Sequence, residues 1–157
     1  MLFELRTCGT CGACCKTHFV HELDKPGGQW CKYRLPGRGC QIYGHHPRAC
    51  KTFRCQWLLG RGEVEERPDR THLVLDFIGG EKLGEPLFLI WEVKRGMLRS
   101  PLAREAEVDV FDQGIVVCRM PLAKQPTLIV PPGRQPEKII EAFKSVGINV
   151  NVCYRTA

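Results

Sequence analysis

The chain has 157 residues, of which 43% are hydrophobic and 25% charged, and it carries a net charge of +6. These values are typical of a globular protein with a hydrophobic core, and the lack of any run of about 20 apolar residues excludes a membrane span. Residues 1–7 show none of the basic, apolar and small-residue parts of a secretory signal. We therefore expect a cytoplasmic protein whose thiols stay reduced.

The first part of the chain, residues 1–60, is rich in Cys, Gly, His and basic residues and has little periodic apolar pattern. A short helix is predicted around residues 11–18, because its potential ligands have the i, i+3, i+4 and i+7 spacing that gathers side chains on one helix face. These residues are Cys11, Cys14, Cys15 and His18. Residues 24–40 contain six Gly and Pro residues and are predicted to form a loop with tight turns.

A second helix is predicted from Pro47 to Leu59. Proline is favoured in the first turn of a helix, and Gly60 follows the last residue as a typical stop signal. The acidic and basic run from Glu63 to Arg70 is interpreted as a solvated connector. Trp57, Tyr43 and Phe53 are expected to provide the apolar cover of the cysteine-rich segment.

The second part of the chain reads as strands alternating with helices. Predicted strands are His72–Ile78, Leu87–Lys94, Ile115–Met120, Thr127–Val130 and Ile148–Tyr154, and the segment Gly79–Pro86 is predicted as a turn. Predicted helices run from Ser100-Pro101 to about Phe111 and from Pro136 to Val146. We predict an α+β fold in which a cysteine-rich metal-binding segment, residues 1–60, packs on a small mixed α/β layer, residues 61–157, as one compact unit.

Ten cysteines are present, and eight of them lie in the first 55 residues: Cys8, Cys11, Cys14, Cys15, Cys31, Cys40, Cys50 and Cys55. The C-x2-C spacing lets two sulfurs approach one ion from a single turn, so it recurs in zinc and iron–sulfur sites. Eight thiols match two sites of four ligands, although the sequence does not assign them. A disulfide scaffold is disfavoured by the expected compartment.

Histidines could replace thiolates as ligands in such sites, and the nearby candidates are His18, His21, His45 and His46. We interpret His18 and His21 as facing solvent rather than binding metal. His45-His46 are interpreted as shaping a turn before Pro47 or as forming hydrogen bonds to ligating groups. Cys118 lies on the alternating apolar face of a predicted strand and is interpreted as a buried thiol, whereas Cys153 is expected to be partly exposed.

The charge is unevenly distributed. Residues 1–62 hold ten Lys/Arg and three Asp/Glu, and residues 63–157 hold thirteen and fourteen. A basic first part alone would suggest nucleic-acid binding. Because a divalent ion bound by four thiolates carries −2, two such sites would offset much of this excess. Basic residues beside the cysteines also favour the thiolate form, and they include Arg6, Lys16, Arg48, Lys51, Arg54 and Arg61.

The chain resembles the CxxCxxCC (YkgJ-like) family of zinc- or iron-chelating proteins in three stretches, which are CGTCGACC, GCQIYGHHPRACKTFRCQW and RPDRTH. The resemblance covers residues 8–78 and places the family's eight cysteines on the eight named above. Two positions depart from the family pattern, since His46 replaces the usual Arg before Pro47 and Gln56 stands where an acidic residue is common. The resemblance implies metal chelation and no established reaction.

Two functions from different classes follow from these residues. The favoured one is a metal-binding protein, with zinc first and iron second, that serves in metal handling or as a partner-binding module stabilised by the metal. The alternative is an iron–sulfur redox or radical enzyme or its electron-transfer accessory. No catalytic residue is singled out, so the sequence leans away from an enzyme. Nucleic-acid binding is disfavoured because the cysteine intervals do not fit C2H2 fingers.

Overall fold

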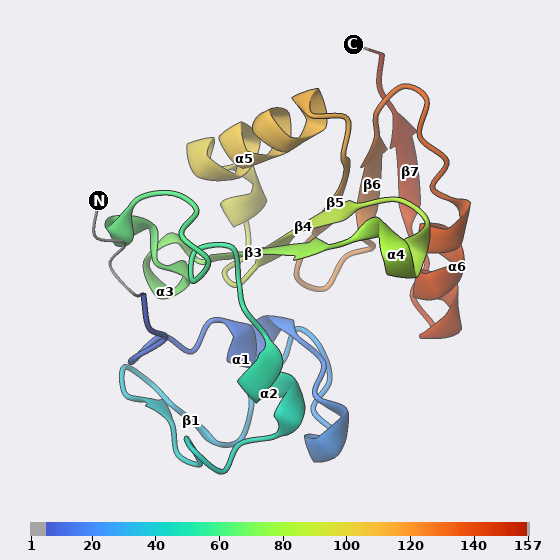
Figure 1. The fold of residues 1–157 in the computed structure, drawn as a ribbon. Coiled ribbons are helices and arrows are strands. Elements are labelled where there is room, and N and C mark those ends of the chain that lie inside the picture. The colour runs from blue at the N-terminus through green and yellow to red at the C-terminus, as the bar shows by residue number, and fades with distance from the viewer. Residues whose placement is uncertain (1–5, 157) are drawn as a thin grey trace.

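The computed structural model describes residues 6–156, and its second half forms one five-stranded sheet (Figure 1). The strands lie side by side in chain order: β3 (Leu73–Ile78), β4 (Leu87–Glu92), β5 (Val116–Met120), β6 (Thr127–Val130) and β7 (Asn151–Tyr154). Antiparallel neighbours, β3/β4 and β5/β6, alternate with parallel neighbours, β4/β5 and β6/β7. The α+β fold class expected from the sequence is confirmed.

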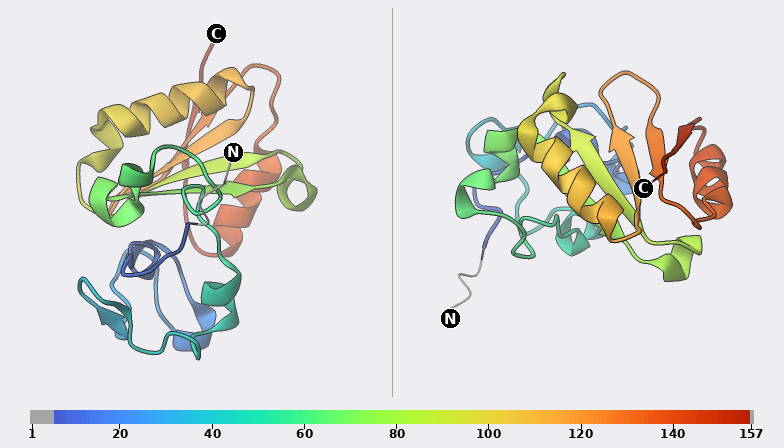
Figure 2. Two further views of the ribbon diagram at one scale, coloured as in Figure 1. Left: turned by 60° about the vertical axis from the view of Figure 1, so that its left-hand side comes forward. Right: turned by 90° about the horizontal axis from the view of Figure 1, so that it is seen from above.

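Each parallel pair is joined by a crossover helix, α5 (Pro101–Asp112) between β4 and β5 and α6 (Glu137–Ser145) between β6 and β7. Because β5 and β6 run in opposite directions, two right-handed crossovers place their helices on opposite faces of the sheet. The two views of Figure 2 show this arrangement, with α5 lying across one face and α6 against the other.

The alternation of side chains along the strands builds a separate core on each face. Buried side chains on the α5 face are Leu73, Phe88, Ile90, Val117 and Ile129 of the sheet with Ala103, Ala106 and Val110 of α5. Buried side chains on the α6 face are Leu87, Leu89, Val116, Cys118, Met120, Leu128 and Val130 with Ile139 of α6. Cys118 is 0% exposed, as its place on a predicted apolar strand face indicated.

The cysteine-rich segment packs on the α6 face at the β3–β4 edge of the sheet (Figure 1). Its elements are α1 (Cys14–Thr17), η1 (His21–Leu23), a two-stranded ribbon of β1 (Arg34–Leu35) and β2 (Gly39–Cys40), and α2 (Arg48–Thr52). A small cluster of Ala13, Val74 and Val93 joins it to the sheet, with Phe53 and Trp91 packed against that cluster.

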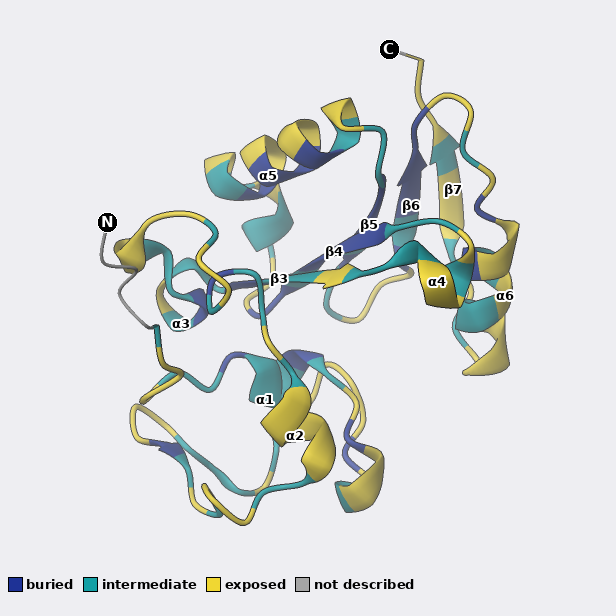
Figure 3. Cartoon of the chain, in the orientation of Figure 1, coloured by how far each residue is buried: buried dark blue, intermediate teal, exposed yellow. Residues whose placement is uncertain are grey.

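Burial differs sharply between the two parts of the chain (Figure 3). Only three apolar side chains in the described part of the first 60 residues are buried, namely Ala13, Val20 and Trp57. The sheet and its helices, in contrast, contain two continuous clusters. The cysteine-rich segment therefore has little hydrophobic core of its own.

Both helices predicted in this segment are much shorter than expected. α1 contains Cys14 and Cys15 but begins after Cys11 and stops before His18, whose backbone is extended. α2 ends at Thr52 rather than Leu59, because Phe53 turns to an extended conformation. Neither helix has a side-chain cap or a buried apolar stripe. Short helices are unstable in water without such support, so neither extends further.

Three short helices lie where the sequence predicted a connector or a turn. η2 (Val64–Glu66) and α3 (Pro68–Thr71) occupy the supposed connector, and α4 (Gly80–Leu83) occupies the supposed turn. η2 begins with a capping box in which Glu63 and Glu66 satisfy each other's backbone N–H groups. The remaining element is η3 (Met97–Arg99), just before α5.

The other boundaries agree closely with expectation. β6 matches its prediction, α5 is capped by Ser100, which accepts a hydrogen bond of 3.3 Å from the Ala103 amide, and β7 begins three residues later than predicted. α5 has 12 residues and is too short to cross a bilayer, and no other helix within residues 6–156 is long and apolar enough to do so.

Candidate metal centre

All eight candidate cysteines lie in the described part of the chain, and none forms a disulfide. Cys8 and Cys50 are exposed and the other six are half-buried. The first C-x2-C is a hydrogen-bonded turn, in which the Cys11 amide donates to the Cys8 carbonyl over 2.8 Å. The Cys31 amide donates to the Cys15 carbonyl over 3.0 Å and so brings the middle loop back to α1.

One set of cysteines lies where the segment meets the sheet. Burial raises the pKa of the Cys11 thiol, and the nearby Cys55 thiol raises it further. Burial also raises the pKa of Cys55, with a smaller contribution from Cys8. Both Cys8 and Cys11 add to the raised pKa of Cys14. We call these four residues, Cys8, Cys11, Cys14 and Cys55, the first cysteine group.

The other set lies around the loop and the two-stranded ribbon. Burial raises the pKa of Cys40, and the nearby Cys15 and Cys31 thiols raise it further. The pKa of Cys50 is raised by burial first and then by Cys15, Cys31 and Cys40. We call these four residues, Cys15, Cys31, Cys40 and Cys50, the second cysteine group.

Cys14 and Cys15 connect the two groups. A hydrogen bond between their thiols raises the pKa of Cys14 well above its ordinary value and lowers that of Cys15 to about 7. The nearby cations Lys25 and Arg34 lower the pKa of Cys15 further, against the opposing effect of burial. Cys15 also raises the pKa of Cys8, so the vicinal pair lies where the two groups meet.

Backbone amides point at several of these sulfurs. Ala13 and Asp69 donate to Cys11, and Ile42 donates to Cys40, which favours the thiolate in each case. The amides of Trp57 and Leu58 do the same at Cys55. Donors two or three residues beyond a cysteine, as at Ala13, Ile42 and Leu58, come from tight turns that wrap the backbone around the sulfur. Hydrogen bonds to the sulfur are a main means by which proteins tune thiolate ligands.

Lys25 supplies a buried positive charge to the second group. Its side chain is buried, with 5% exposure, and Nζ donates to the carbonyl oxygens of Lys16, at 3.0 Å, and of His18. Burial lowers the pKa of Lys25, and the neighbouring thiols Cys15, Cys31, Cys14 and Cys50 oppose that shift. Lys25 could not be recognised from the sequence, because nothing in its spacing distinguishes it from a solvated lysine.

Two polar contacts fix the first group to the sheet part. Arg67 pairs with Asp69 through two hydrogen bonds of 2.7 Å and also donates to Thr10 Oγ1 at 3.2 Å, between the first two cysteines. Arg6 donates to the carbonyl oxygens of Trp57, Arg61 and Gly62 at 2.7–2.9 Å, so it joins the start of the described chain to the turn after Cys55. Arg54 lies near Cys8 and opposes the rise of its pKa.

Gly39 lets the ribbon approach the first cysteine turn. Its φ is +91°, and a Cβ at this position would lie 3.0 Å from the carbonyl oxygen of Gly9. A side chain would both strain the backbone and force the ribbon away from that turn. The register of the ribbon pairs Cys40 with Arg34, which places this guanidinium on the side of Cys15.

The interpretation of His18 as a solvent-facing residue is wrong. Its ring lies between Phe53 and Trp91, with centroid distances of 4.2 and 4.7 Å, and its Nε2 is 3.6 Å from Asp76 Oδ2. The extended backbone at His18 turns this side chain from α1 toward the sheet. His18 is therefore part of the contact between the two parts of the chain.

The other flanking residues agree in part with expectation. His21 and His45 are exposed, and His46 Nδ1 accepts a hydrogen bond of 3.0 Å from the Gly44 amide, as a turn residue would. Trp57 is buried and Phe53 is half-buried, but Tyr43 is 69% exposed and covers no cysteine. Tyr43 instead stacks on His46, with ring centroids 5.0 Å apart.

The two cysteine groups are neighbourhoods and not formed coordination shells. Within residues 6–156, no three Cys, His, Asp or Glu side chains converge closely enough to hold a metal ion. Cys118 stays in the core of the sheet, where burial raises its pKa to about 12, and Cys153 is half-buried on β7. The donor chemistry of both groups, four sulfurs each, nevertheless fits a thiophilic ion.

No known protein family's model matches this chain, and no curated protein or solved structure is significantly similar to it. Membership of the CxxCxxCC family therefore stays a prediction from the motifs.

Proposed function

We propose that this protein binds two thiophilic metal ions, zinc first and iron second, one in each cysteine group, and that its role is structural or metal handling rather than catalytic. The observation that supports this proposal is that the eight cysteines lie in two neighbourhoods of four within one segment, which meet at Cys14 and Cys15. Four donors are the number that a closed tetrahedral zinc site requires.

The electrostatics of the groups supports a bound cation. Burial raises the pKa of Cys8, Cys11, Cys40, Cys50 and Cys55, so these sulfurs are protonated at neutral pH when no cation is near. A divalent ion would stabilise all four thiolates of a group, and its binding would release their protons. The amide donors at Cys11, Cys40 and Cys55 favour the same charged form.

A structural role follows from the small core of the cysteine-rich segment. Ala13, Val20 and Trp57 are its only buried apolar side chains within the described range. A segment of this length gains too little from burial to offset the entropy of ordering its backbone. Metal coordination would supply the missing free energy, as it does in small zinc domains.

Zinc is preferred because it favours closed thiolate-rich sites and needs no redox partner, while iron can use the same ligands. Ten free cysteines also suit a reducing compartment, so we place the function in the cytoplasm.

The first test is elemental analysis and visible absorption of anaerobically purified protein. The proposal expects about two zinc ions per chain and no colour. Iron with sulfide and a charge-transfer band would instead support the iron–sulfur alternative. A folded protein with neither metal would refute metal binding altogether.

Serine variants then test the division into groups. Cys55→Ser and Cys50→Ser are each expected to reduce zinc from about two ions to about one. The double variant Cys11→Ser/Cys55→Ser, within one group, should still hold about one ion, whereas Cys50→Ser/Cys55→Ser, across the groups, should hold about none. Cys153→Ser is the matched control and should keep both ions. Equal losses in the two double variants would contradict the assignment.

A further inference from the structure

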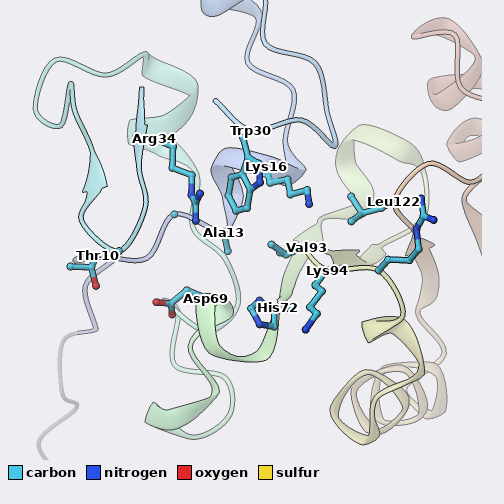
Figure 4. Close-up of a pocket in the computed structure, with 13 residues that line it drawn as sticks. Thr10, Ala13, Lys16, Trp30, Arg34, Asp69, His72, Val93, Lys94 and Leu122 are labelled. Carbon is cyan, nitrogen blue, oxygen red and sulfur yellow. The ribbon is translucent and has the colours of Figure 1, made fainter. Parts of the chain in front are cut away.

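A cavity of about 660 Å³ lies where the cysteine-rich segment meets the sheet part (Figure 4). One wall comes from the cysteine-rich segment and includes Thr10, Lys16, Trp30 and Arg34. The other wall comes from the turn after α3 and the loops after β4 and β5, and includes His72, Lys94, Arg95 and Leu122. This volume is within the range of pockets for small organic ligands.

Four cations line this cavity, Lys16 and Arg34 from one wall and Lys94 and Arg95 from the other. Within residues 6–156, none of these four side chains makes a hydrogen bond or an ion pair with a carboxylate. The one carboxylate in the lining, Asp69, is already paired with Arg67. The cavity lining therefore holds four cations that no carboxylate of the described residues pairs with, and one of them, Arg34, also lies near Cys15.

The cavity also has an aromatic and apolar surface. The guanidinium of Arg34 stacks over the Trp30 ring at 3.5 Å from its centroid, and Lys16 Nζ lies 5.2 Å from the same ring. The buried side chains of Ala13 and Val93, with Leu122, complete the lining. Trp30 is 42% exposed, so part of its surface stays available for contact.

The wall on the sheet side is held by one buried carboxylate. Glu92, at 4% exposure, accepts hydrogen bonds from the amides of Gly96 and Leu98 through one oxygen and from Leu122, at 3.0 Å, through the other. These bonds fix the turn that carries Lys94 and Arg95 against the loop that carries Leu122. The two loops are therefore positioned before any ligand binds, which lowers the entropic cost of binding.

We propose that this cavity binds a small organic phosphate of about the size of a nucleotide. Four cations without a carboxylate partner favour a ligand with several negative charges. Phosphate groups carry such charges, whereas a single carboxylate carries only one. The aromatic and apolar lining favours an organic group beside the phosphates. The cations line one cavity from two walls rather than forming a stripe along a surface, which favours a small molecule over a nucleic-acid backbone. This site uses none of the eight cysteines.

The test is titration of the metal-loaded full chain with ADP, adenosine and inorganic pyrophosphate, followed by tryptophan fluorescence and calorimetry. ADP is expected to bind, to change the fluorescence of Trp30 and to bind more weakly as salt rises. Adenosine is expected to bind at least about 10-fold more weakly than ADP, because it lacks the charge. The variant Trp30→Phe should lose the fluorescence change and keep binding by calorimetry.

The variants Lys16→Gln and Lys94→Gln test the two walls, and each is expected to weaken ADP binding about 10-fold, or about 1.4 kcal/mol. Lys144→Gln, an exposed lysine on α6, is the control for net charge and should bind as the unchanged protein does. Metal content and thermal melting are measured for every variant, so that loss of the metal sites or of the fold is distinguished from loss of this ligand.

Three results would overturn the proposal. The first is ADP binding that is undetectable or equally weakened by Lys144→Gln and Lys94→Gln. The second is equal affinity for pyrophosphate and ADP, which would show that the organic group of the ligand contributes nothing to binding. The third is tight binding of a single-stranded oligonucleotide that ADP does not displace, which would indicate a nucleic-acid surface.

Discussion

The thiols of Cys14 and Cys15 share a hydrogen bond that separates their pKa values, raising that of Cys14 and lowering that of Cys15 to about 7. Successive residues of a helix point about 100° apart, so these neighbours in α1 face different surroundings. Cys14 lies near Cys8 and Cys11, while Cys15 lies near Lys25 and Arg34 and also acts on Cys8. One short helix thus joins the two cysteine groups.

Cys15 is expected to be the first thiol to react with an alkylating reagent in reduced, metal-free protein. A lowered pKa means that its thiolate fraction rises as the pH increases through about 7, so the rate should increase with a midpoint near that value. Peptide mapping by mass spectrometry against pH measures this. Cys14→Ala removes the hydrogen-bond donor and should raise the midpoint. An unchanged midpoint in that variant would contradict the thiol–thiol hydrogen bond.

Cys118 provides the internal reference for that experiment. It is 0% exposed, and burial raises its pKa to about 12. It should stay unmodified until denaturant unfolds the sheet, so its modification serves as a measure of global unfolding.

Removal of metal is expected to release the cysteine-rich segment and leave the sheet folded. The segment has few buried apolar side chains, whereas the two faces of the sheet have their own cores. Hydrogen exchange followed by mass spectrometry, before and after chelation, should therefore show loss of protection in residues 6–60 and retained protection in β4, β5 and β6. Uniform loss throughout the chain would indicate one cooperative unit instead.

Lys25→Met is expected to destabilise the cysteine-rich segment. The change leaves the carbonyl oxygens of Lys16 and His18 without their donor in a buried position, at a cost of about 1–3 kcal/mol. It also removes the cation that lowers the pKa of Cys15, so the alkylation midpoint should rise. Lys82→Met, on the exposed face of α4, makes the same chemical change far from the cysteines and should alter neither quantity.

Ser100→Ala is expected to reduce stability by about 1 kcal/mol, because it removes the side-chain oxygen that caps α5 at the Ala103 amide. Denaturant unfolding followed by circular dichroism measures the change. Metal content should stay the same, since α5 lies on the face of the sheet opposite the cysteine-rich segment. A loss of metal in this variant would show that the two faces are more strongly coupled than the packing indicates.

Most of the sheet and its helices could be predicted from the sequence. The β-branched and apolar run Thr127–Val130 and the Ser100-Pro101 start of α5 are local signals, and the structure agrees with both. The helices predicted around Cys11 and from Pro47 to Leu59 are present but shorter than predicted, because the prediction relied on the spacing of potential ligands and on single proline and glycine residues rather than on an apolar stripe. The burial of His18 between Phe53 and Trp91 could not be predicted, since Trp91 lies on a distant strand.

The sequence by itself determined the α+β class and the inventory of eight cysteines within the first 55 residues, because periodicity and ligand spacing are properties of neighbouring residues. Only the tertiary structure decided which sulfurs approach one another. Cys55 lies near Cys8 and Cys11 because the chain returns to them after the loop. Lys25 is held near Cys15 because its Nζ donates hydrogen bonds to the carbonyl oxygens of Lys16 and His18. The cavity also depends on the tertiary structure, because its cations come from two parts of the chain that meet only when the chain is folded.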